Sequence, residues 1–206
     1  MATVYLVDAS PYIFRAFYSI PDTFSSPDGR PTNAVYGFTN FLIQLVKKAS
    51  PTHLVVTFDG SLTTSFRNRL YPEYKAQRAL PPADLEEQIS ICFDVTEAMG
   101  MLALIHDEYE SDDLLATLTH RFVAEGADVV VVSSDKDLTQ LVNARVGFWD
   151  FARDERVDTA GVKAKFGVGP HQMVDFLALT GDAVDNIPGV KGIGPKTAAL
   201  LLAHFD

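Results

Sequence analysis

The sequence predicts an α/β fold in which helices cover both faces of a parallel sheet. Short apolar runs recur along the chain, and longer stretches with helical periodicity separate them. The runs are continuously apolar rather than alternating, which is typical of strands that are buried on both faces. Strand–helix–strand alternation with connections of this length favours a doubly wound, Rossmann-like sheet.

Five apolar runs carry the strand prediction. They are Thr3–Val7, His53–Phe58, Met101–Ile105, Asp128–Val132 and Val146–Trp149. Their lengths suit strands better than helices.

Helical patterns fill the intervals between these runs. They cover residues 33–48, 84–99 and 111–125, and the chain turns helical again from residue 158. We expect Asn33 and Asp84 to cap the first two helices. We expect Gly100 and Gly126 to end the second and third helices.

Composition sets broad limits on the class of protein. A length of 206 residues suits one α/β domain, with or without a small appendage. Cys92 is the single cysteine, so an internal disulfide is excluded, and its apolar surroundings predict a core residue. Because the chain has no bilayer-length apolar run and no secretion signal at its start, we expect a cytosolic protein without membrane contact. The net charge of −10 by itself argues against nucleic-acid binding.

Acidic residues gather where the predicted strands end. The set comprises Asp8, Asp59, Glu110, Asp112, Asp113, Asp135 and Asp137. The carboxyl ends of parallel strands share one edge of the sheet, so we expect these carboxylates to lie close together. Like charges at close range raise each other's pKa, and divalent cations relieve this repulsion. Oxygen ligands favour Mg²⁺ or Mn²⁺, and two such ions about 4 Å apart can support phosphodiester hydrolysis. The alternative is that single acids such as Asp112, Asp135 and Asp182 are only helix caps.

A glycine-rich string follows near the end of the sequence. Gly189, Gly192 and Gly194 permit a tight turn between helices, and Lys191 and Lys196 add positive charge. Such a turn can present helix N-terminal amides to a phosphate, which predicts a helix–hairpin–helix type of DNA-binding element. A plain interhelical turn is the alternative interpretation.

Two further acids lie just before this turn. Asp182 and Asp185 are three residues apart and could complete a metal site on one helical face.

Residues 61–82 form a long connection without a clean period. Arg67, Arg69, Lys75 and Arg78 face a single acid, Glu73, and aromatic residues are interleaved with them. Cations mixed with aromatic rings suit a single strand of nucleic acid, through phosphate pairing and base stacking. A solvated loop is the alternative.

These motifs together resemble the 5′–3′ exonuclease and flap endonuclease superfamily, in its bacterial form that stands alone or precedes a DNA polymerase I. The matching strings are Leu6-Val7-Asp8, Thr57-Phe58-Asp59, Phe66-Arg67, Tyr74-Lys75-Ala76-Gln77-Arg78, Glu110-Ser111-Asp112-Asp113, Ser134-Asp135-Lys136-Asp137-Leu138 and the segment Gly181–Ala198. They follow the family order over nearly the whole chain.

The resemblance implies a PIN-like nuclease with two Mg²⁺ or Mn²⁺ ions. One ion would be held mainly by Asp8, Asp59, Glu110, Asp112 and Asp113, and the other by Asp135, Asp137, Asp182 and Asp185. Residues 61–82 would form an arch over the active site. There Lys75 and Arg78 would lie nearest the scissile phosphate, and Tyr74 would stack on the terminal base. Asp8, Asp112 and Asp135 would share catalysis with Lys75 and Arg78.

The resemblance also implies the partners of the protein. DNA with 5′ flaps, nicks or 5′ ends would be bound by Arg67, Tyr74, Lys75, Arg78, Gly189, Lys191, Gly192, Gly194, Lys196 and Thr197. A K⁺ ion would sit at the glycine-rich turn, and a DNA polymerase would be fused to the chain or work with it. We expect a monomer with a catalytic domain at 1–157 and a helical DNA-binding region at 158–206. Because family domains continue with more helices, we expect this sequence to be a fragment.

Three other classes of protein are weighed against this interpretation. A toxin-type ribonuclease lacks the glycine-rich turn, and a receiver-like phosphoryl-transfer domain leaves both that turn and the arch unexplained. A non-catalytic DNA-binding module gains nothing from so many clustered carboxylates.

Overall fold

Six strands form one sheet in the part of the chain that the computed structural model describes, residues 2–60 and 64–205. They are β1 (Thr3–Asp8), β2 (His53–Asp59), β3 (Leu102–His106), β4 (Asp128–Val132), β5 (Val146–Asp150) and β6 (Glu155–Val157). The order across the sheet is β3-β2-β1-β4-β5-β6, and the first five strands pair in parallel. The five predicted strands are confirmed to within one residue at each end. β6 pairs antiparallel with β5, and its three residues are too few to show a period in the sequence.

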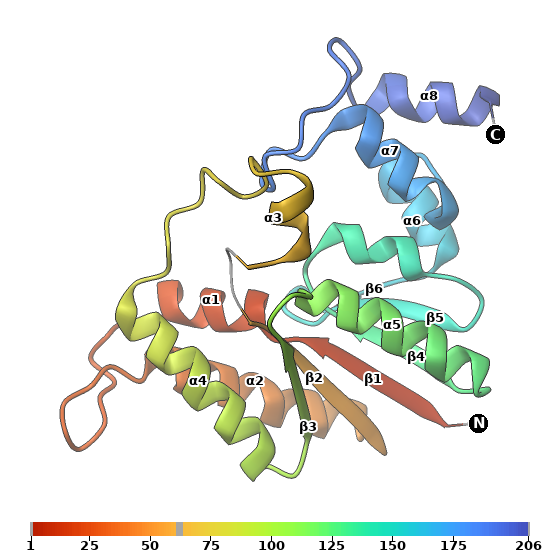
Figure 1. The fold of residues 1–206 in the computed structure, drawn as a ribbon. Helices are drawn as coiled ribbons and strands as arrows, with labels where there is room; N and C mark the ends of the chain where they lie inside the picture. The colour runs from red at the N-terminus through yellow and green to blue at the C-terminus, as the bar shows by residue number, and fades with distance from the viewer. Residues whose placement is uncertain (1, 61–63, 206) are drawn as a thin grey trace.

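Helices cover both faces of this sheet. They are α1 (Ser10–Ser19), α2 (Asn33–Ala49), α3 (Phe66–Leu70), α4 (Ala83–Ala98), α5 (Ser111–Ala124), α6 (Thr159–Phe166), α7 (Met173–Thr180) and α8 (Pro195–Phe205), with the 3₁₀ turns η1 (Lys136–Leu141) and η2 (Pro170–Gln172). Figure 1 shows α1, α2 and α4 on one face and α5 on the other. The predicted α/β architecture is confirmed. No helix in the described ranges is long and apolar enough to cross a bilayer.

The core is divided into two layers by the sheet. Along β1, Leu6 points into the layer under α5, whereas Val7 points into the layer under α1 and α2. Both are fully buried. Because alternate residues of one strand reach opposite faces, an apolar run without alternation is what a sheet covered on both sides requires.

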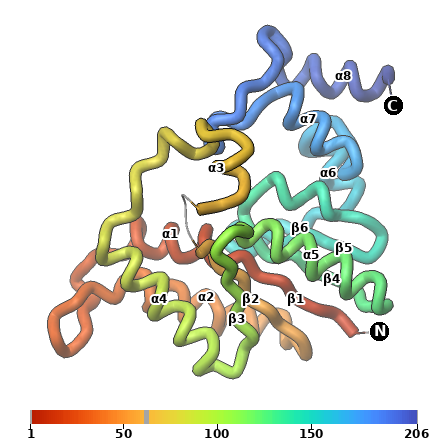
Figure 2. Tube along the Cα trace, viewed as in Figure 1, coloured from red at the N-terminus to blue at the C-terminus, as the bar shows by residue number. Residues whose placement is uncertain are grey.

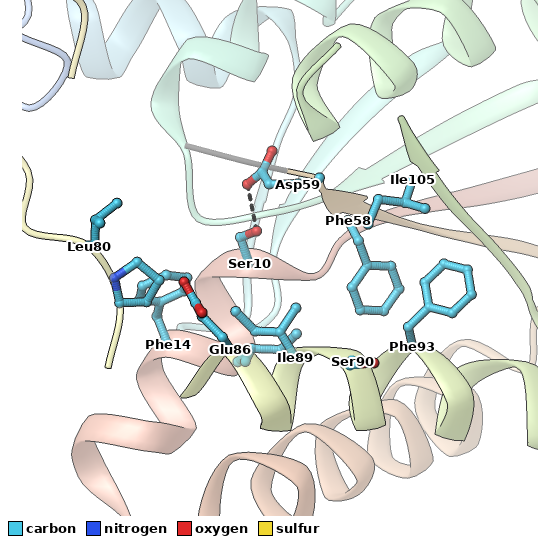
Figure 3. A pocket seen from close by; sticks show the side chains of 13 residues that line it. Ser10, Phe14, Phe58, Asp59, Leu80, Glu86, Ile89, Ser90, Phe93 and Ile105 are labelled. Atoms are coloured by element: carbon cyan, nitrogen blue, oxygen red, sulfur yellow. Dashed lines mark hydrogen bonds between the residues drawn. The ribbon is translucent and has the colours of Figure 1, made fainter. Parts of the chain in front are cut away.

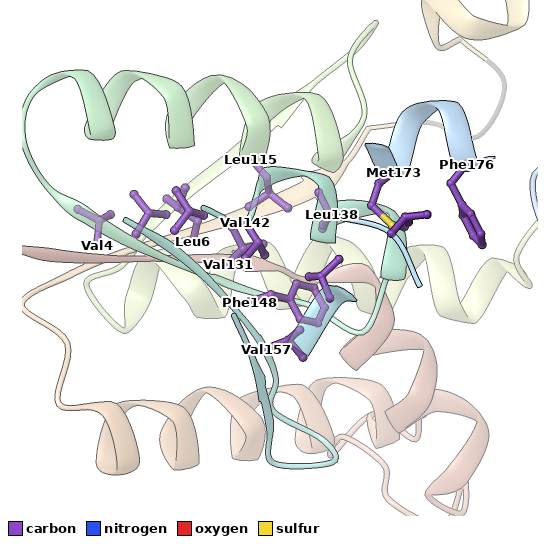
Figure 4. Packing of buried hydrophobic residues seen from close by; sticks show 14 of the residues in the cluster. Val4, Leu6, Leu115, Val131, Leu138, Val142, Phe148, Val157, Met173 and Phe176 are labelled. Carbon is purple, nitrogen blue, oxygen red and sulfur yellow. The ribbon is translucent and has the colours of Figure 1, made fainter. Parts of the chain in front are cut away.

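The layer under α5 extends into the C-terminal helices. Val162, Met173, Phe176 and Ala198 belong to the same buried cluster as Leu6. Figure 4 shows Met173 next to Leu138 of η1, with Phe176 at the end of the cluster away from Val4. The C-terminal helical region is therefore packed against the sheet through shared apolar core.

Two predicted helix caps are wrong. Asn33 is the first residue of α2, and its side-chain amide donates to the carbonyl oxygens of Phe17 (2.8 Å) and Ile20 (3.0 Å). It therefore ties α2 to the end of α1 instead of capping its own helix. α4 begins at Ala83, and no side chain, including that of Asp84, caps it.

The predicted helix ends are confirmed. Gly100 and Gly126 follow α4 and α5 with φ of +79° and +90°. Glycine has no Cβ and adopts this left-handed conformation at little cost.

The helix α1 was not predicted from the sequence. α1 follows β1 after a single residue, and its ring at Tyr12 stacks on Phe41 of α2 with centroids 3.8 Å apart. Its aromatic residues give a weak helical signal, and packing against α2 stabilises it. Cys92 of α4 is fully buried as predicted, and burial raises the pKa of its thiol to about 12.

Residues 64–82 contain less regular structure than a helical arch. Residues 61–63 of this predicted arch, like Met1 and Asp206 at the ends of the two predicted domains, lie outside the described residues. The remainder holds the short helix α3, several turns and an extended connection to α4. Figure 2 traces this connection, in yellow, from α3 down to the start of α4.

Candidate active site at the carboxyl edge of the sheet

The site begins at the point where the strand order reverses. β1 lies between β2 and β4, so the chain leaves β1 on one side and later returns on the other. In open α/β sheets such a switch point opens a crevice beyond the strand ends. The register places Asp8 opposite Thr57 and next to the strand end at Val132. The first carboxylate of the candidate site therefore sits in this crevice.

Asp8 is held by two serine hydroxyls. Ser111 Oγ donates to Oδ1 at 3.0 Å and Ser133 Oγ donates to Oδ2 at 2.8 Å. Burial, then the nearby Asp59, raise the pKa of Asp8 from 3.8 to about 7, although the two serines lower it. A cation next to this carboxyl would stabilise its ionised form and lower its pKa.

Asp59 lies at the end of the adjacent strand, β2. Its Oδ2 accepts a hydrogen bond from Ser10 Oγ at 2.7 Å, and its Oδ1 accepts from the backbone N–H of Ser111 at 2.8 Å. The start of α1 and the start of α5 thus orient this carboxylate. Ser111 contacts both Asp8 and Asp59, so it fixes the two acids relative to each other.

Asp112 shares the electrostatic environment of these acids. Burial raises its pKa well above 3.8, and the negative charges of Asp8, Asp135 and Asp59 raise it further. The helix, strand and loop acids are therefore close enough to interact, as the sequence predicts. Asp112 makes no hydrogen bond that would identify it as a helix cap within the described residues.

Asp113 has a different environment from its neighbour. Arg67 donates to both its oxygens, at 2.5 and 2.8 Å, and Asp113 Oδ2 also accepts from the backbone N–H of Glu110 at 3.0 Å. The hydrogen bond to Asp113 raises the pKa of Arg67. Both oxygens of Asp113 thus accept hydrogen bonds, and Oδ2 joins the Arg67 side chain to the backbone of Glu110. The two hydrogen bonds to Asp113 engage the guanidinium group of Arg67, one of the predicted DNA-binding residues.

The second group of acids joins the sheet to the C-terminal region. Asp135 follows β4 and accepts the backbone N–H of Asp137 at 2.9 Å, as a helix cap does. Asp182 accepts the N–H of Val184 at 2.7 Å, and its Oδ2 is 2.6 Å from Lys136 Nζ. Burial and Asp135 raise the pKa of Asp137, whereas Lys136 and backbone hydrogen bonds lower that of Asp182 despite its burial.

Cations of the predicted arch reach the acids. Lys75 Nζ donates to Glu110 Oε2 at 2.7 Å, and Arg78 donates to Asp185 Oδ1 at 2.6 Å. Tyr74 donates to both Glu110 (3.0 Å) and Asp185 (3.1 Å) through its hydroxyl. The Tyr74 residue is only 6% exposed, so in this conformation its ring is not available to stack on a base. The stacking role of Tyr74 stays a prediction, and in this conformation the hydroxyl links two acids.

The backbone of the arch is also bonded to the loop that carries Asp185. Lys75 N–H donates to the carbonyl oxygen of Asp185 at 3.0 Å, and the Asn186 side chain donates to that of Glu73 at 2.7 Å. Gln77 donates to the carbonyls of the same loop. The arch and the C-terminal region, more than 100 residues apart in sequence, are thus docked together beside the acids.

The glycine-rich turn connects α7 to α8 as a hairpin loop (residues 181–194). A Cβ at Gly189 would lie 2.4 Å from the backbone of Thr180, and one at Gly181 would lie 2.4 Å from Gly189 N. Only glycines permit the two ends of this loop to approach so closely.

The predicted DNA-binding residues of the hairpin point outward. Lys191, Gly192, Gly194, Lys196 and Thr197 are all exposed. Neither lysine forms an ion pair with any residue in 2–60 or 64–205. They are therefore free to meet a phosphate backbone.

A largely apolar pocket of about 690 Å³ opens next to Asp59. Phe14, Phe58 and Phe93 line it, and Leu80 from the end of the arch borders it. Figure 3 shows Ser10 and Asp59 joined by their hydrogen bond at one side of this pocket. Aromatic surface therefore continues directly from the acidic edge.

The donor set fits divalent cations, although the acids are held apart by other partners. No three of them converge as ready ligands within the described ranges. Ammonium and guanidinium groups of lysine and arginine form ion pairs with four of the acids, Glu110, Asp185, Asp137 and Asp182. Oxygen donors with raised carboxyl pKa values and positively charged partners match the chemistry of Mg²⁺ or Mn²⁺.

Sequence analysis missed the serines that orient the acids. Ser111 lies within a quoted motif, and Ser10 and Ser133 lie two residues from a predicted acid, but their hydroxyls carry no pattern of their own. Arg15 was missed with its helix, and it lines a polar pocket of about 330 Å³ together with Ser134.

Comparison with known proteins agrees with this arrangement. The 5′–3′ exonuclease N-terminal resolvase-like domain matches residues 3–167, and the 5′–3′ exonuclease C-terminal SAM fold matches residues 168–206. The bacteriophage T5 5′-exonuclease with bound zinc superposes with a TM-score of 0.80 at 23% identity, over 98% of this chain and 75% of that one. A T5 flap endonuclease in complex with DNA and metal ions gives 0.78 at 22% identity, over the same shares. These structures establish the fold, and the two family models describe it as a resolvase-like N-terminal domain followed by a C-terminal SAM fold.

The chain belongs to the 5′–3′ exonuclease family. The 5′–3′ exonuclease of Aquifex aeolicus (strain VF5) is 41% identical over 205 residues, which is 100% of this chain and 70% of that protein. DNA polymerase I of Rhizobium leguminosarum is 44% identical over 209 residues, which is 98% of this chain and 20% of the polymerase. The chain thus spans about a fifth of the length of that polymerase.

Proposed function

We propose that this chain is a divalent-metal-dependent 5′ nuclease that hydrolyses DNA phosphodiester bonds near 5′ ends, at flaps and nicks. The observation that carries the proposal is the position of Asp8, Asp59 and Asp112 at one strand edge, where burial and then the charges of neighbouring carboxylates raise the pKa of Asp8 and Asp112. Such mutual repulsion stabilises nothing in the protein alone and is relieved by bound cations. Membership of the family supports the same reaction.

The acids divide into two groups that would each hold one ion. Asp8, Asp59, Glu110 and Asp112 surround the ends of β1 and β2 and the start of α5, and Asp135, Asp137, Asp182 and Asp185 lie toward the hairpin. When bound, the two ions supply an activated water and a Lewis acid for the phosphate. We assign Asp113 to positioning Glu110, because Arg67 occupies its oxygens.

The arch cations act on the substrate once ions replace them at the acids. Lys75 now pairs with Glu110, and Arg78 with Asp185. Ions at these carboxylates would free both side chains to face the phosphate that is cleaved. Positive groups at a phosphoryl centre stabilise the charge that develops on its oxygens in the transition state.

The remaining partners are part of the same proposal. The exposed Lys191 and Lys196 would bind the backbone of duplex DNA through charge, with a K⁺ ion at the hairpin loop. The pocket beside Asp59 offers aromatic surface to bases of the 5′ strand. A polymerase partner or fusion, action as a monomer and a cytoplasmic location complete the proposal.

Cleavage of matched flap, nicked and single-stranded DNAs tests this function. We expect hydrolysis with Mg²⁺ or Mn²⁺ and none with EDTA. Asp112→Asn and Asp135→Asn should each abolish it, whereas Asp94→Asn, an exposed acid on α4, should not. Metal-dependent cleavage that survives in both site variants would show that the acids are not the catalytic centre.

A further inference from the structure

Lys136 bridges two acids that come from distant parts of the chain. Its Nζ lies 2.6 Å from Asp182 Oδ2 and 3.2 Å from Asp137 Oδ1. The Asp182 side chain is only 11% exposed and that of Asp137 26%, while the lysine side chain is 46% exposed. One ammonium group therefore contacts two carboxylates and offsets half of their combined negative charge.

This arrangement differs from an ordinary surface ion pair. Asp137 belongs to η1 beside the sheet, and Asp182 lies in the loop after α7. In the described residues, no other lysine or arginine is paired with either acid. Lys136 is itself the residue between Asp135 and Asp137, so its backbone is fixed beside the acids while its half-exposed side chain has room to move.

We propose that Lys136 is a positioning residue that stands in for the second divalent ion. This inference rests on the proposed function, in which Asp137 and Asp182 hold that ion. Without the ion, the ammonium group keeps the two carboxylates together across the joint between sheet and C-terminal region. With the ion, the same oxygens must turn to the metal, and Lys136 must withdraw.

The consequence is a competition between lysine and metal. A divalent ion can bind at these acids only after both contacts of Lys136 are broken or weakened. A partly exposed ion pair contributes at most a factor of about five to an equilibrium constant. Removing the lysine charge should therefore tighten ion binding at this site by up to about fivefold, because the ion no longer competes with the ammonium group.

The test compares Mn²⁺ binding to the wild-type chain and to Lys136→Met, by titration calorimetry without DNA. Asp182→Asn identifies which of the bound ions belongs to this site. The matched control is Lys165→Met, which removes a similarly exposed lysine that pairs with Glu155 away from the acids. We expect tighter binding at the Asp182-dependent site in Lys136→Met and no change in Lys165→Met.

Thermal unfolding gives a second readout that does not depend on catalysis. In EDTA, Lys136→Met should melt below the wild type, because Asp137 and Asp182 then repel each other without a cation. Saturating Mn²⁺ should raise its Tm more than that of the wild type, since an ion that binds only the folded state stabilises it in proportion to the logarithm of its affinity.

The outcomes separate this inference from the proposed function. Equal or weaker Mn²⁺ affinity in Lys136→Met, while Asp182→Asn still loses an ion, overturns the role of Lys136 and leaves the nuclease proposal standing. If the wild type binds no ion that depends on Asp182, both are wrong. Lys136→Gln, which keeps a polar side chain, should behave as Lys136→Met does, and a difference between them would mean that packing rather than charge is responsible.

Discussion

Replacing Asp8 by Asn should make the metal-free protein more stable at neutral and higher pH. Asp8 is 4% exposed, and burial and the charge of Asp59 raise its pKa from 3.8 to about 7. A carboxyl with a raised pKa in the folded state binds its proton more tightly there than in the unfolded chain. Its contribution to stability is fully present below pH 3.8 and is lost as pH rises through about 7.

The size of this effect follows from the shift. About three pKa units at about 1.4 kcal/mol each correspond to ~4 kcal/mol of lost stability once Asp8 is fully ionised. Asn keeps the shape and can still accept a hydrogen bond from Ser133, but it carries no charge. In EDTA at pH 8, Asp8→Asn should therefore raise the free energy of unfolding by up to about 4 kcal/mol. At pH 5 the two proteins should differ much less.

Urea unfolding between pH 5 and pH 8 in EDTA measures this difference directly. Asp94→Asn serves as the control, because it removes an exposed acid outside the site. Mg²⁺ should reverse the order of stability at pH 8, since the wild type has lost no ligand and gains more from the ion. A gain in Asp8→Asn that is equal at pH 5 and pH 8, or a loss at pH 8, would refute the electrostatic reasoning.

Three further outcomes follow from the site and the hairpin. Gly189→Ala should destabilise the chain by more than about 1 kcal/mol in thermal unfolding and impair DNA binding, because the added Cβ would lie 2.4 Å from backbone atoms. Gly194→Ala is the control and should fold normally, because a Cβ there would meet open space. Equal stability of the two variants would contradict the close approach at Gly189. Lys75→Ala should lower kcat for flap cleavage by about 10²-fold or more, with a smaller change in KM. A change in KM alone would mean that Lys75 contributes only to substrate binding. Arg67→Lys should lower the free energy of unfolding in urea by about 1 kcal/mol, since lysine cannot donate to both oxygens of Asp113 in the fixed geometry of a guanidinium group. An unchanged midpoint of the urea transition would show that this paired geometry is dispensable.

The strands and the membership of the acidic set could be predicted because local sequence carries them. A buried parallel strand needs a continuous apolar run, so the order of residues along the chain is enough to place Asp8 and Asp59 at strand ends. The glycines at 189, 192 and 194 stand out for a similar reason, since their clustering has no use in a helix.

The errors share a physical cause, which is the dominance of packing over local preference. Asn33 has the chemistry of a cap, yet its amide bonds to two carbonyls at the end of α1, a helix that the sequence did not predict. The surroundings of Tyr74 were equally invisible in the sequence, because its hydroxyl lies between Glu110 and Asp185. Both partners lie far away in sequence, so no local pattern could indicate them.

By itself, the sequence determined the α/β class, the strand ends that carry acids and the family to which the chain belongs. Periodicity and residue type are enough for these, because they depend on neighbours along the chain. Only the tertiary structure decided what each acid contacts: serines at Asp8 and Asp59, Arg67 at Asp113, and Lys136 between Asp137 and Asp182. Those contacts depend on where β1, β4, α5 and the hairpin meet, and the charge state of a carboxyl depends on what surrounds it in space.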